Sequence, residues 1–230
     1  PVPLVTSVVV ADDKESLFTR KPLEEVYTQI VTDLQEGVSN LSNDGSKSRA
    51  SRAAAQGLLA KVYLTQPTPN YDGARAMCEA IVGSGEFSLE PDFSDVFYNE
   101  SNNEVIFSIE YIAGNPDESQ GFSSEFTSYK RQGRQDGLNI VNPNLVVDFN
   151  SHGGNRTAAS FAAFGTDVQL PIPENAEVIK FLPVGSDISD TNNPSYGSSP
   201  GDAGNDWIVL RYSDILLLHA EALMAGGDTT

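Results

Sequence analysis

The stretch Asp206–Gly227, DWIVLRYSDILLLHAEALMAGG, is the most apolar part of a chain whose formal net charge is −18. Charged residues nevertheless stand inside it. At the rotation of about 100° per residue of an α-helix, Arg211, Asp214 and Glu221 fall on one narrow stripe. Apolar residues cover most of the remaining surface. The pattern predicts a closing helix over 207–226 whose charges line one edge of an apolar cylinder.

The charged stripe has two interpretations. In the first, Arg211 pairs with Asp214, and Glu221 takes a donor from another element, which makes a structural ion-pair seam between packed helices. In the second, Asp214 and Glu221 are the paired carboxylates of a glycoside hydrolase. We favour the seam, because two carboxylates on one face of a helix are common and no third catalytic group is placed near them.

Three further amphipathic segments precede this stretch. Apolar residues recur at three- and four-residue spacing over 23–41, which predicts a helix of several turns. Ser51 is a candidate N-cap for a second helix, which Pro67 and Pro69 stop. A third helix begins at about Tyr71 and ends at the stretch GSGEF. We expect the second and third helices to form an antiparallel hairpin.

The middle of the chain has fewer regular patterns. The stretch NEVIFSIEY, residues 103–111, alternates apolar and polar side chains and predicts a strand. NPNLVVDFN, residues 142–150, suits a short helix after its proline. No period survives over 113–137 or 183–205, and loops of such length are either functional or disordered.

The composition limits the classes of partner. Asp and Glu total 32 against 14 Lys and Arg among 230 residues, so nucleic acid and anionic lipid surfaces are poor partners. Cys78 is the only cysteine, and we expect a buried structural thiol. No apolar run is long enough for a transmembrane helix. The N-terminal PVPLVTSVVVADD lacks the features of a signal peptide and an initiator Met, which indicates an internal piece or a processed chain.

Several sequence blocks, in a fixed order, carry a resemblance to a known family. The hairpin block spans 52–97, the E-x-I-F-S strand lies at 104–108, and a Lys-Phe step follows at 180–181. Residues 207–222 match a W-x-x-x-R-Y-x-[DE]-x-x-L-x-x-A-E-A signature. The series resembles the SusD/RagB family. The hairpin alone also fits a tetratricopeptide repeat, but one hairpin cannot bury its own face.

The resemblance implies a mainly α fold, the SusD-like α-superhelix, with tetratricopeptide-like hairpins, long loops and a few short strands. We expect a single SusD-like domain fragment over 1–230. Its parts are repeat-like helices at 20–85, a loop-rich segment with short strands at 86–206, and the signature helix at 207–226. Family members are much longer, begin with a lipoprotein signal and continue past the last helix, so we expect this chain to be part of one.

The resemblance also implies a function. Such proteins are similar to lipid-anchored lipoproteins of the outer membrane and cell surface of Bacteroidetes. They capture glycans and deliver them to a TonB-dependent SusC-like transporter; they are not enzymes and need no cofactor. The anchor would not be present in this chain. Two alternatives stay open: a peptide-binding, RagB-like member, and a repeat-type scaffold for protein interactions without a small ligand.

The ligand site has no family motif, so its residues are chosen by their chemistry. The stretch GFSSEFTSYKRQGR, residues 121–134, interleaves aromatic and basic side chains that suit stacking and hydrogen bonding to a ligand. The candidate ligand-binding residues are Phe122, Phe126, Tyr129, Arg131, Arg134 and, in the second loop, Tyr196. We expect Trp207 in the core.

Metal and catalytic patterns are weak. His152 and His219 stand far apart in sequence, and each is expected to be a structural residue. DISDTNN and GDAGND offer oxygen ligands without the spacing of an EF-hand, so no metal site is predicted.

Overall fold

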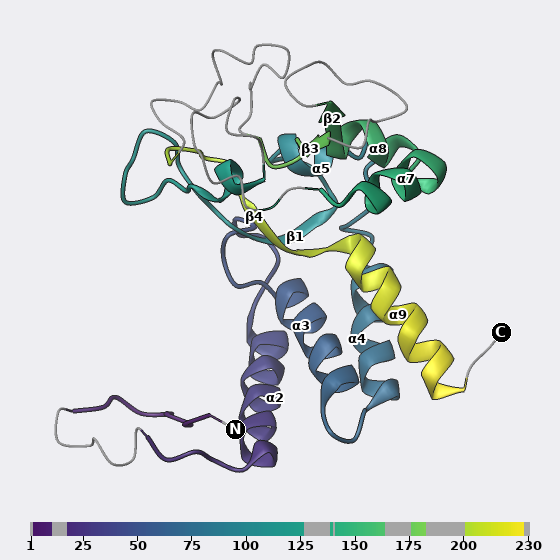
Figure 1. Ribbon diagram of the computed structural model, residues 1–230. Helices are drawn as coiled ribbons and strands as arrows, with labels where there is room; N and C mark the ends of the chain where they lie inside the picture. Colours follow the sequence, from purple (N-terminus) through teal and green to yellow (C-terminus); the bar gives the residue numbers. More distant parts are fainter. Residues whose placement is uncertain are drawn as a thin grey trace. The chain divides into compact units, whose positions relative to one another are not determined.

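The computed structural model describes residues 2–10, 18–126, 139, 141–163, 176–182 and 201–227 (Figure 1). The chain forms two compact units. The helical unit comprises Pro1–Ser88 with Leu210–Thr230, and the loop-rich unit comprises Leu89–Val209. The prediction of a mainly α chain with a few short strands is confirmed. The division into two units was not indicated by the sequence pattern.

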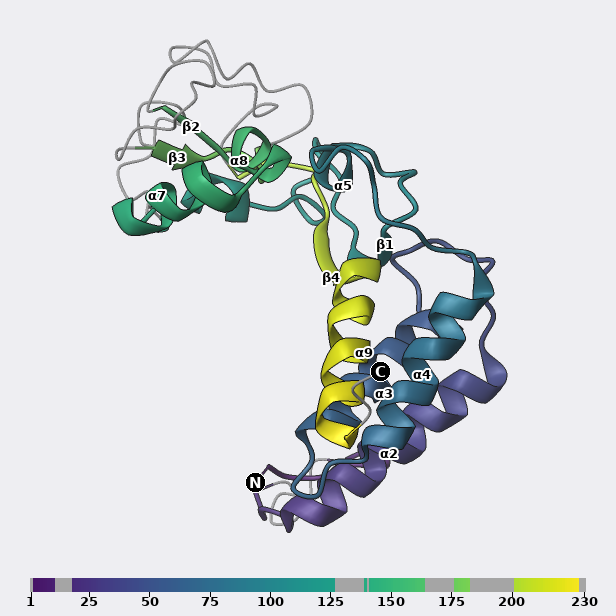
Figure 2. The ribbon, with the colours of Figure 1, turned by 90° about the vertical axis from the view of Figure 1, so that its right-hand side faces the viewer.

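In the described residues, four helices build the helical unit: α2 (Leu23–Asn40), α3 (Arg52–Thr65), α4 (Tyr71–Ser84) and α9 (Tyr212–Gly226). They lie side by side in the order α2, α3, α4, α9 (Figure 1), and Figure 2 shows the same helices from the side of α9. The core cluster contains Leu59, Tyr63, Leu64, Ala74 and Ala222. Because α3 has neighbours on several sides, it buries small residues around its first turns, which lets the other helices approach closely.

Local signals, of which Ser51 and the GSGEF stretch were predicted, set the boundaries of α3 and α4. Ser51 Oγ accepts a hydrogen bond from the Ala54 backbone N–H at 3.1 Å, which confirms the predicted N-cap of α3. Asn70 performs the same function for α4, since its Oδ1 accepts from the Gly73 N–H at 2.9 Å. Helix α4 ends at Gly85, whose φ of 68° lies in the left-handed region that favours glycine.

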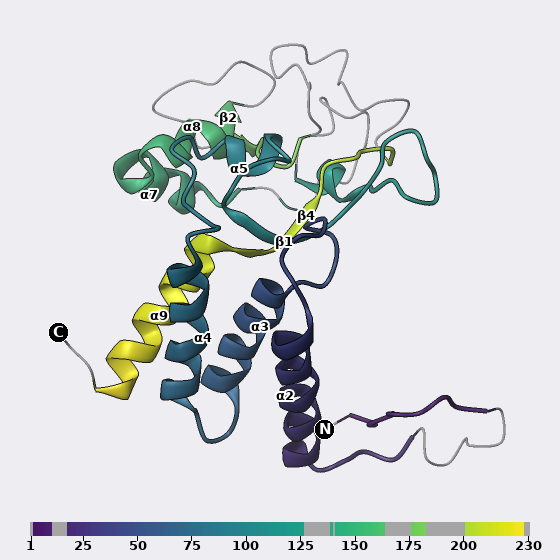
Figure 3. The ribbon, with the colours of Figure 1, turned by 180° about the vertical axis from the view of Figure 1, so that it is seen from behind.

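The loop-rich unit contains short elements: α5 (Asp95–Tyr98), β1 (Val105–Ile109), the 3-10 helix η1 (Phe122–Glu125), α7 (Pro143–His152), α8 (Asn155–Ser160), β2 (Phe161–Ala163) and β3 (Ala176–Val178). Strands β2 and β3 pair antiparallel, with Phe161 opposite Val178. Helices α7 and α8 lie beside β2 (Figure 3), and Val146, Phe161 and Ala176 form a buried cluster there. The predicted strand at 103–111 and the predicted helix after Pro143 are confirmed.

The closing segment departs from the prediction. Residues Trp207–Arg211 form strand β4, which pairs with β1, and α9 begins only at Tyr212. The predicted helix over 207–226 is therefore wrong for its first five residues. WIVL is rich in aromatic and β-branched residues, and a strand partner outweighs the helical period in so short a run. Arg211 has an extended backbone, with φ −125° and ψ 160°, so the helical stripe does not reach it.

Candidate functional site: a partly exposed aromatic cluster

Two of the predicted ligand-binding residues lie on or next to η1. Phe122 begins this short helix, and Phe126 follows its last residue. Both rings contact Phe181: the centroid of Phe126 lies 4.5 Å from that of Phe181, and the centroid of Phe122 lies 6.2 Å from it. The predicted residues Tyr129, Arg131, Arg134 and Tyr196 lie outside the described residues.

The cluster extends to Trp207. The Trp207 ring system stacks on Phe181 with a centroid distance of 6.0 Å and an angle of 21° between the planes. Phe122 meets the same indole edge-on, at 5.0 Å and 83°. Tyr111 adds a further edge contact to Phe122 at 6.0 Å. These four rings and Phe126 are called the aromatic cluster below.

The expectation that Trp207 belongs to the core is wrong. Trp207 is 40% exposed, and the rings of Phe122, Phe126 and Phe181 are half-buried. The expectation assumed a place at the start of a helix, whereas Trp207 is the first residue of β4. Large apolar rings that gather with part of their surface in water are typical of interaction sites.

The local fold brings these rings together from four segments distant in sequence. Tyr111 follows β1, η1 carries Phe122, Phe181 follows β3, and Trp207 opens β4. The loop before η1 is tied to the segment before β4 by reciprocal backbone hydrogen bonds between Gln120 and Ala203, at 2.9 and 3.0 Å. The aromatic cluster is therefore a product of tertiary structure.

A positive charge lies against the edge of the aromatic cluster. Lys180 Nζ stands 5.0 Å from the centroid of Phe181 and 5.5 Å from that of Phe97. A cation over ring faces at such distances is attracted by the ring quadrupole. Tyr98, beside Phe97, donates its hydroxyl to the Ile179 carbonyl at 2.7 Å, and burial raises the pKa of Tyr98 to about 12. The phenol is therefore a neutral hydrogen-bond donor throughout the physiological pH range.

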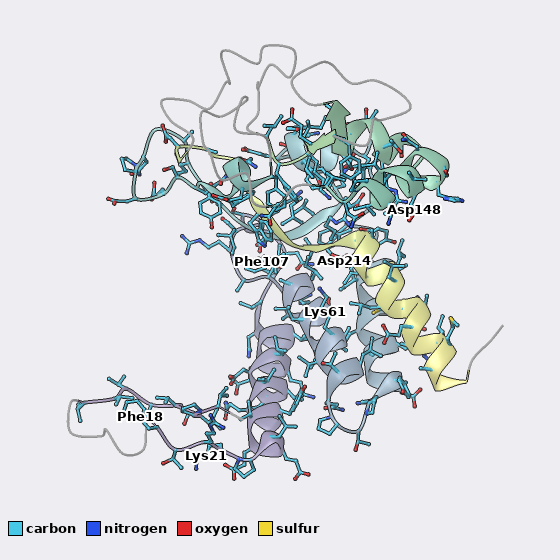
Figure 4. All side chains as sticks on the ribbon, viewed as in Figure 1. Phe18, Lys21, Lys61, Phe107, Asp148 and Asp214 are labelled. Carbon is cyan, nitrogen blue, oxygen red and sulfur yellow. The ribbon has the colours of Figure 1, made fainter. Side chains whose placement is uncertain are left out.

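The residues of the predicted ion-pair seam are placed differently from one another. Asp214, labelled at the start of α9 in Figure 4, accepts a hydrogen bond at its Oδ2 from the backbone N–H of Arg211, at 3.0 Å. It thereby satisfies the backbone N–H of the N-cap residue at the N-terminal end of α9, as in a capping box. Glu221 is exposed. The ion-pair seam itself stays a prediction.

Other reactive groups occupy structural positions. Cys78 is fully buried in α4, as predicted, and burial raises the pKa of its thiol to about 11. His219 Nε2 lies 3.7 Å from Glu79 Oε1, where α9 packs against α4 within the helical unit. Among the described residues, no group of three or more His, Cys, Asp or Glu side chains could hold a metal ion.

Sequence reasoning missed Tyr111, Phe181 and Trp207 as members of the site. In the sequence, the Lys180–Phe181 step is only a family block, Trp207 is a signature position expected in the core, and Tyr111 is the last position of a predicted strand. One signal was available. Trp207 follows two polar residues, Asn205 and Asp206, and opens an apolar run, a position at which a strand end can expose a ring.

The fold and the site together define a class of protein: a helical protein that presents half-buried aromatic rings from a loop-rich unit. Two family models match the chain. One, described as starch-binding associating with outer membrane, matches residues 1–64, and the SusD family model matches residues 185–230. A SusD-like protein of Bacteroides ovatus is 30% identical over 46% of this chain and 22% of its own length.

Solved structures extend the likeness over nearly the whole chain. A SusD superfamily protein of Bacteroides thetaiotaomicron has a TM-score of 0.73 at 21% identity, over 99% of this chain and 48% of its own. Surface glycan-binding protein A of the same species, solved with laminarihexaose, has a TM-score of 0.67 at 18% identity, over 90% of this chain and 51% of its own. These likenesses establish the fold.

The two family-model matches and the shared fold support assignment of the chain to the SusD/RagB family. The chain spans about half the length of these solved relatives, and the matched stretch covers 22% of the curated relative. In the part of the chain that the structure describes, no helix is both long and apolar enough to cross a membrane.

Proposed function

We propose that this protein binds glycans through the aromatic cluster and takes part in their capture at the cell surface. The observation that carries the proposal is the Phe181–Trp207 stack, whose outer ring is 40% exposed. A pyranose ring has a face of C–H groups that packs against an aromatic plane, while its hydroxyls reach polar groups at the rim. Ligand sites commonly combine such an apolar surface with a few polar groups.

The charge of the chain favours an uncharged ligand. With a net charge of −18, the protein repels polyanions at long range, whereas a neutral oligosaccharide meets no such barrier. Dispersion and desolvation of ring faces do not depend on net charge. The surface glycan-binding protein with the same fold, which was solved with laminarihexaose, supports this class of ligand.

The finer statements of the proposal rest on the family. The protein would act as a binder without hydrolysing its ligand and would hand the glycan to a TonB-dependent SusC-like transporter. Its place would be the outer membrane at the cell surface, held by a lipid anchor on the full-length protein. The description of the family model that matches residues 1–64, starch-binding associating with outer membrane, supports this location.

The proposal is tested by affinity electrophoresis in gels that contain laminarin, xyloglucan or starch, followed by calorimetry with the matching oligosaccharide. We expect one polysaccharide to retard the protein, and Trp207→Ala and Phe181→Ala to weaken binding about tenfold or more, because each removes a stacking face. The control is Phe18→Ala, since Phe18 is 81% exposed and belongs to the N-terminal segment (Figure 4).

Three results would contradict the proposal. The first is that no polysaccharide is retained while peptides bind, which would assign the protein to a peptide-binding, RagB-like function. The second is glycan binding that is equally strong in the wild type and in both cluster variants, which would place the site elsewhere. The third is the release of reducing ends from the bound polysaccharide, which would make the protein a hydrolase.

A further inference from the structure

The side chain of Asn205 joins three segments of the loop-rich unit. Its Oδ1 accepts hydrogen bonds from Gln120 Nε2 at 2.6 Å and from Ser123 Oγ at 2.8 Å. Its Nδ2 donates to the carbonyl oxygen of Phe181 at 3.0 Å. Gln120 Nε2 also donates to Ser123 Oγ at 2.8 Å. The amide of Asn205 therefore uses both its donor and its acceptor inside the protein.

This network is shielded from water. Gln120 is 5% exposed, Ser123 is fully buried, and Asn205 is 8% exposed. A buried polar group that loses its partner bears the full cost of desolvation, so the bonds of such a network hold their partners at fixed distances. The loop before η1, η1 itself, the turn at Phe181 and the approach to β4 are thus fixed to one another.

The next residue, Asp206, performs a similar function toward β1. Its Oδ2 accepts from Ser108 Oγ at 3.0 Å, and its Oδ1 accepts from the backbone N–H of Tyr111 at 3.2 Å. Hydrogen bonds to a carboxylate are stronger than those between neutral groups. Two consecutive side chains before β4 therefore hold different segments: Asn205 holds η1 and the turn at Phe181, and Asp206 holds β1 and the residues that follow it.

Most of these bonds end at the backbone of a residue of the aromatic cluster or at a residue next to one. Asn205 holds the Phe181 carbonyl and the hydroxyl of Ser123, which follows Phe122 in sequence. Asp206 holds the Tyr111 N–H and directly precedes Trp207. We infer that Asn205 and Asp206 are positioning residues that fix the relative orientation of the four rings and thereby determine affinity for a glycan.

The inference rests on the proposed function as far as ligand affinity is concerned, but its geometric part can be measured without ligand. Trp207 is the only tryptophan in the sequence. Its near-ultraviolet circular dichroism therefore reports the environment of one ring in the aromatic cluster. A residue that merely stabilises the fold would change the unfolding temperature and leave this signal unchanged.

Asn102 provides a matched control. It is a buried asparagine of the same unit, 4% exposed, and its Nδ2 donates to the carbonyls of Val96 and Asn99 while its Oδ1 accepts from backbone N–H groups. Replacing it by Asp removes a donor of the same kind from a network at α5. Asn102→Asp and Asn205→Asp should thus cost similar amounts of stability while differing in their effect on the aromatic cluster.

The experiment compares the wild type with Asn205→Asp, Asp206→Asn, Ser123→Ala and Asn102→Asp. Each protein is characterised by thermal unfolding, by the near-ultraviolet spectrum of Trp207, and by calorimetric titration with laminarihexaose. We expect Asn205→Asp and Asp206→Asn to alter the Trp207 spectrum and to weaken laminarihexaose binding about tenfold or more, because a lost buried bond releases the rings. Asn102→Asp should leave both the spectrum and the affinity unchanged.

Ser123→Ala keeps the test informative if Asn205→Asp does not fold, because it removes one hydroxyl and adds no charge; it should produce a smaller change of the same kind. Wild-type spectra and affinity in folded Asn205→Asp and Ser123→Ala would overturn the inference. Equal losses of affinity in Asn102→Asp and Asn205→Asp would overturn it as well. Failure of the wild type to bind any glycan would contradict the proposed function instead, and the Trp207 spectra would still decide the positioning.

Discussion

A side chain at position 57 would collide with Leu210. A Cβ atom on Gly57 of α3 would overlap Leu210 Cδ2 and would lie 2.9 Å from Ile215 Cδ1. Both of these residues are fully buried, so neither can swing away into solvent. Gly57 thus allows Leu210, near the end of β4, and Ile215, in the first turn of α9, to pack directly against the backbone of α3.

The first prediction concerns this contact. Gly57→Ala should lower the free energy of unfolding by about 1–3 kcal/mol, because overpacking a buried contact costs more than the gain in helix propensity. Chemical denaturation measures the change. The matched control is Gly83→Ala in α4, where a Cβ would meet nothing within 4 Å; it should be neutral or stabilising. A Gly57→Ala protein as stable as the wild type would contradict the close contact.

The second prediction concerns the loop beside the aromatic cluster. A Cβ on Gly204 would lie 2.7 Å from the backbone nitrogen of Ala113, which cannot give way as a side chain can. Gly204→Ala should therefore displace the segment that leads to Trp207 and weaken glycan binding severalfold, as calorimetry would show. Gly201→Ala is the control, because its Cβ meets nothing within 4 Å. Equal affinities for the two variants would refute the prediction.

The third prediction separates the capping role of Asp214 from catalysis. Asp214→Ala removes the acceptor for the Arg211 N–H and should lower the free energy of unfolding by about 0.5–2 kcal/mol. Glu221→Gln changes an exposed side chain and should cost less than about 0.5 kcal/mol. Both variants should bind glycan as the wild type does. Loss of a hydrolytic activity in Glu221→Gln would instead revive the paired-carboxylate interpretation.

The fourth prediction concerns Cys78. Its thiol is fully buried, and its pKa is raised from 9.0 to about 11. The folded protein should therefore react with a thiol reagent at pH 8 only as fast as it opens, and added denaturant should make the reaction fast. Rapid labelling of the native protein would show that the thiol is accessible.

The same shift gives the stability of the protein a pH dependence. Between about pH 9 and 11 the thiol ionises in the unfolded chain while it stays protonated in the folded one, so stability falls as pH rises through this window. Cys78→Ala removes this contribution. The variant should therefore lose less stability than the wild type between pH 8 and pH 10.5, as denaturation at the two pH values would show.

The local signals of the helical unit were readable from the sequence. Ser51, Asn70 and Gly85 fix helix ends through contacts within three residues, and such signals need no knowledge of distant partners. The strand at Val105–Ile109 was predicted from its alternating sequence, but its burial does not follow that alternation, because Val105, Ile106 and Ser108 are all buried and Ile109 is exposed.

The strand β4 and the aromatic cluster could not be predicted in this way. The run WIVLR suits a strand as well as a helix, and its partner β1 lies about a hundred residues earlier in the chain. The meeting of Phe181 with Trp207 depends on the bond from Asn205 to the Phe181 carbonyl, between residues 24 positions apart. No sequence periodicity predicts a contact of this kind, because the contact depends on how several irregular segments pack together in the folded chain.

The division of the chain has a consequence for how such proteins diversify. The loop-rich unit is an insertion in the primary sequence, since the helical unit resumes at Leu210 after stopping at Ser88. The chain passes from one unit to the other twice, after Ser88 and after Val209. The aromatic cluster lies wholly within the inserted stretch, so its residues can be substituted without changing any residue of the helical unit.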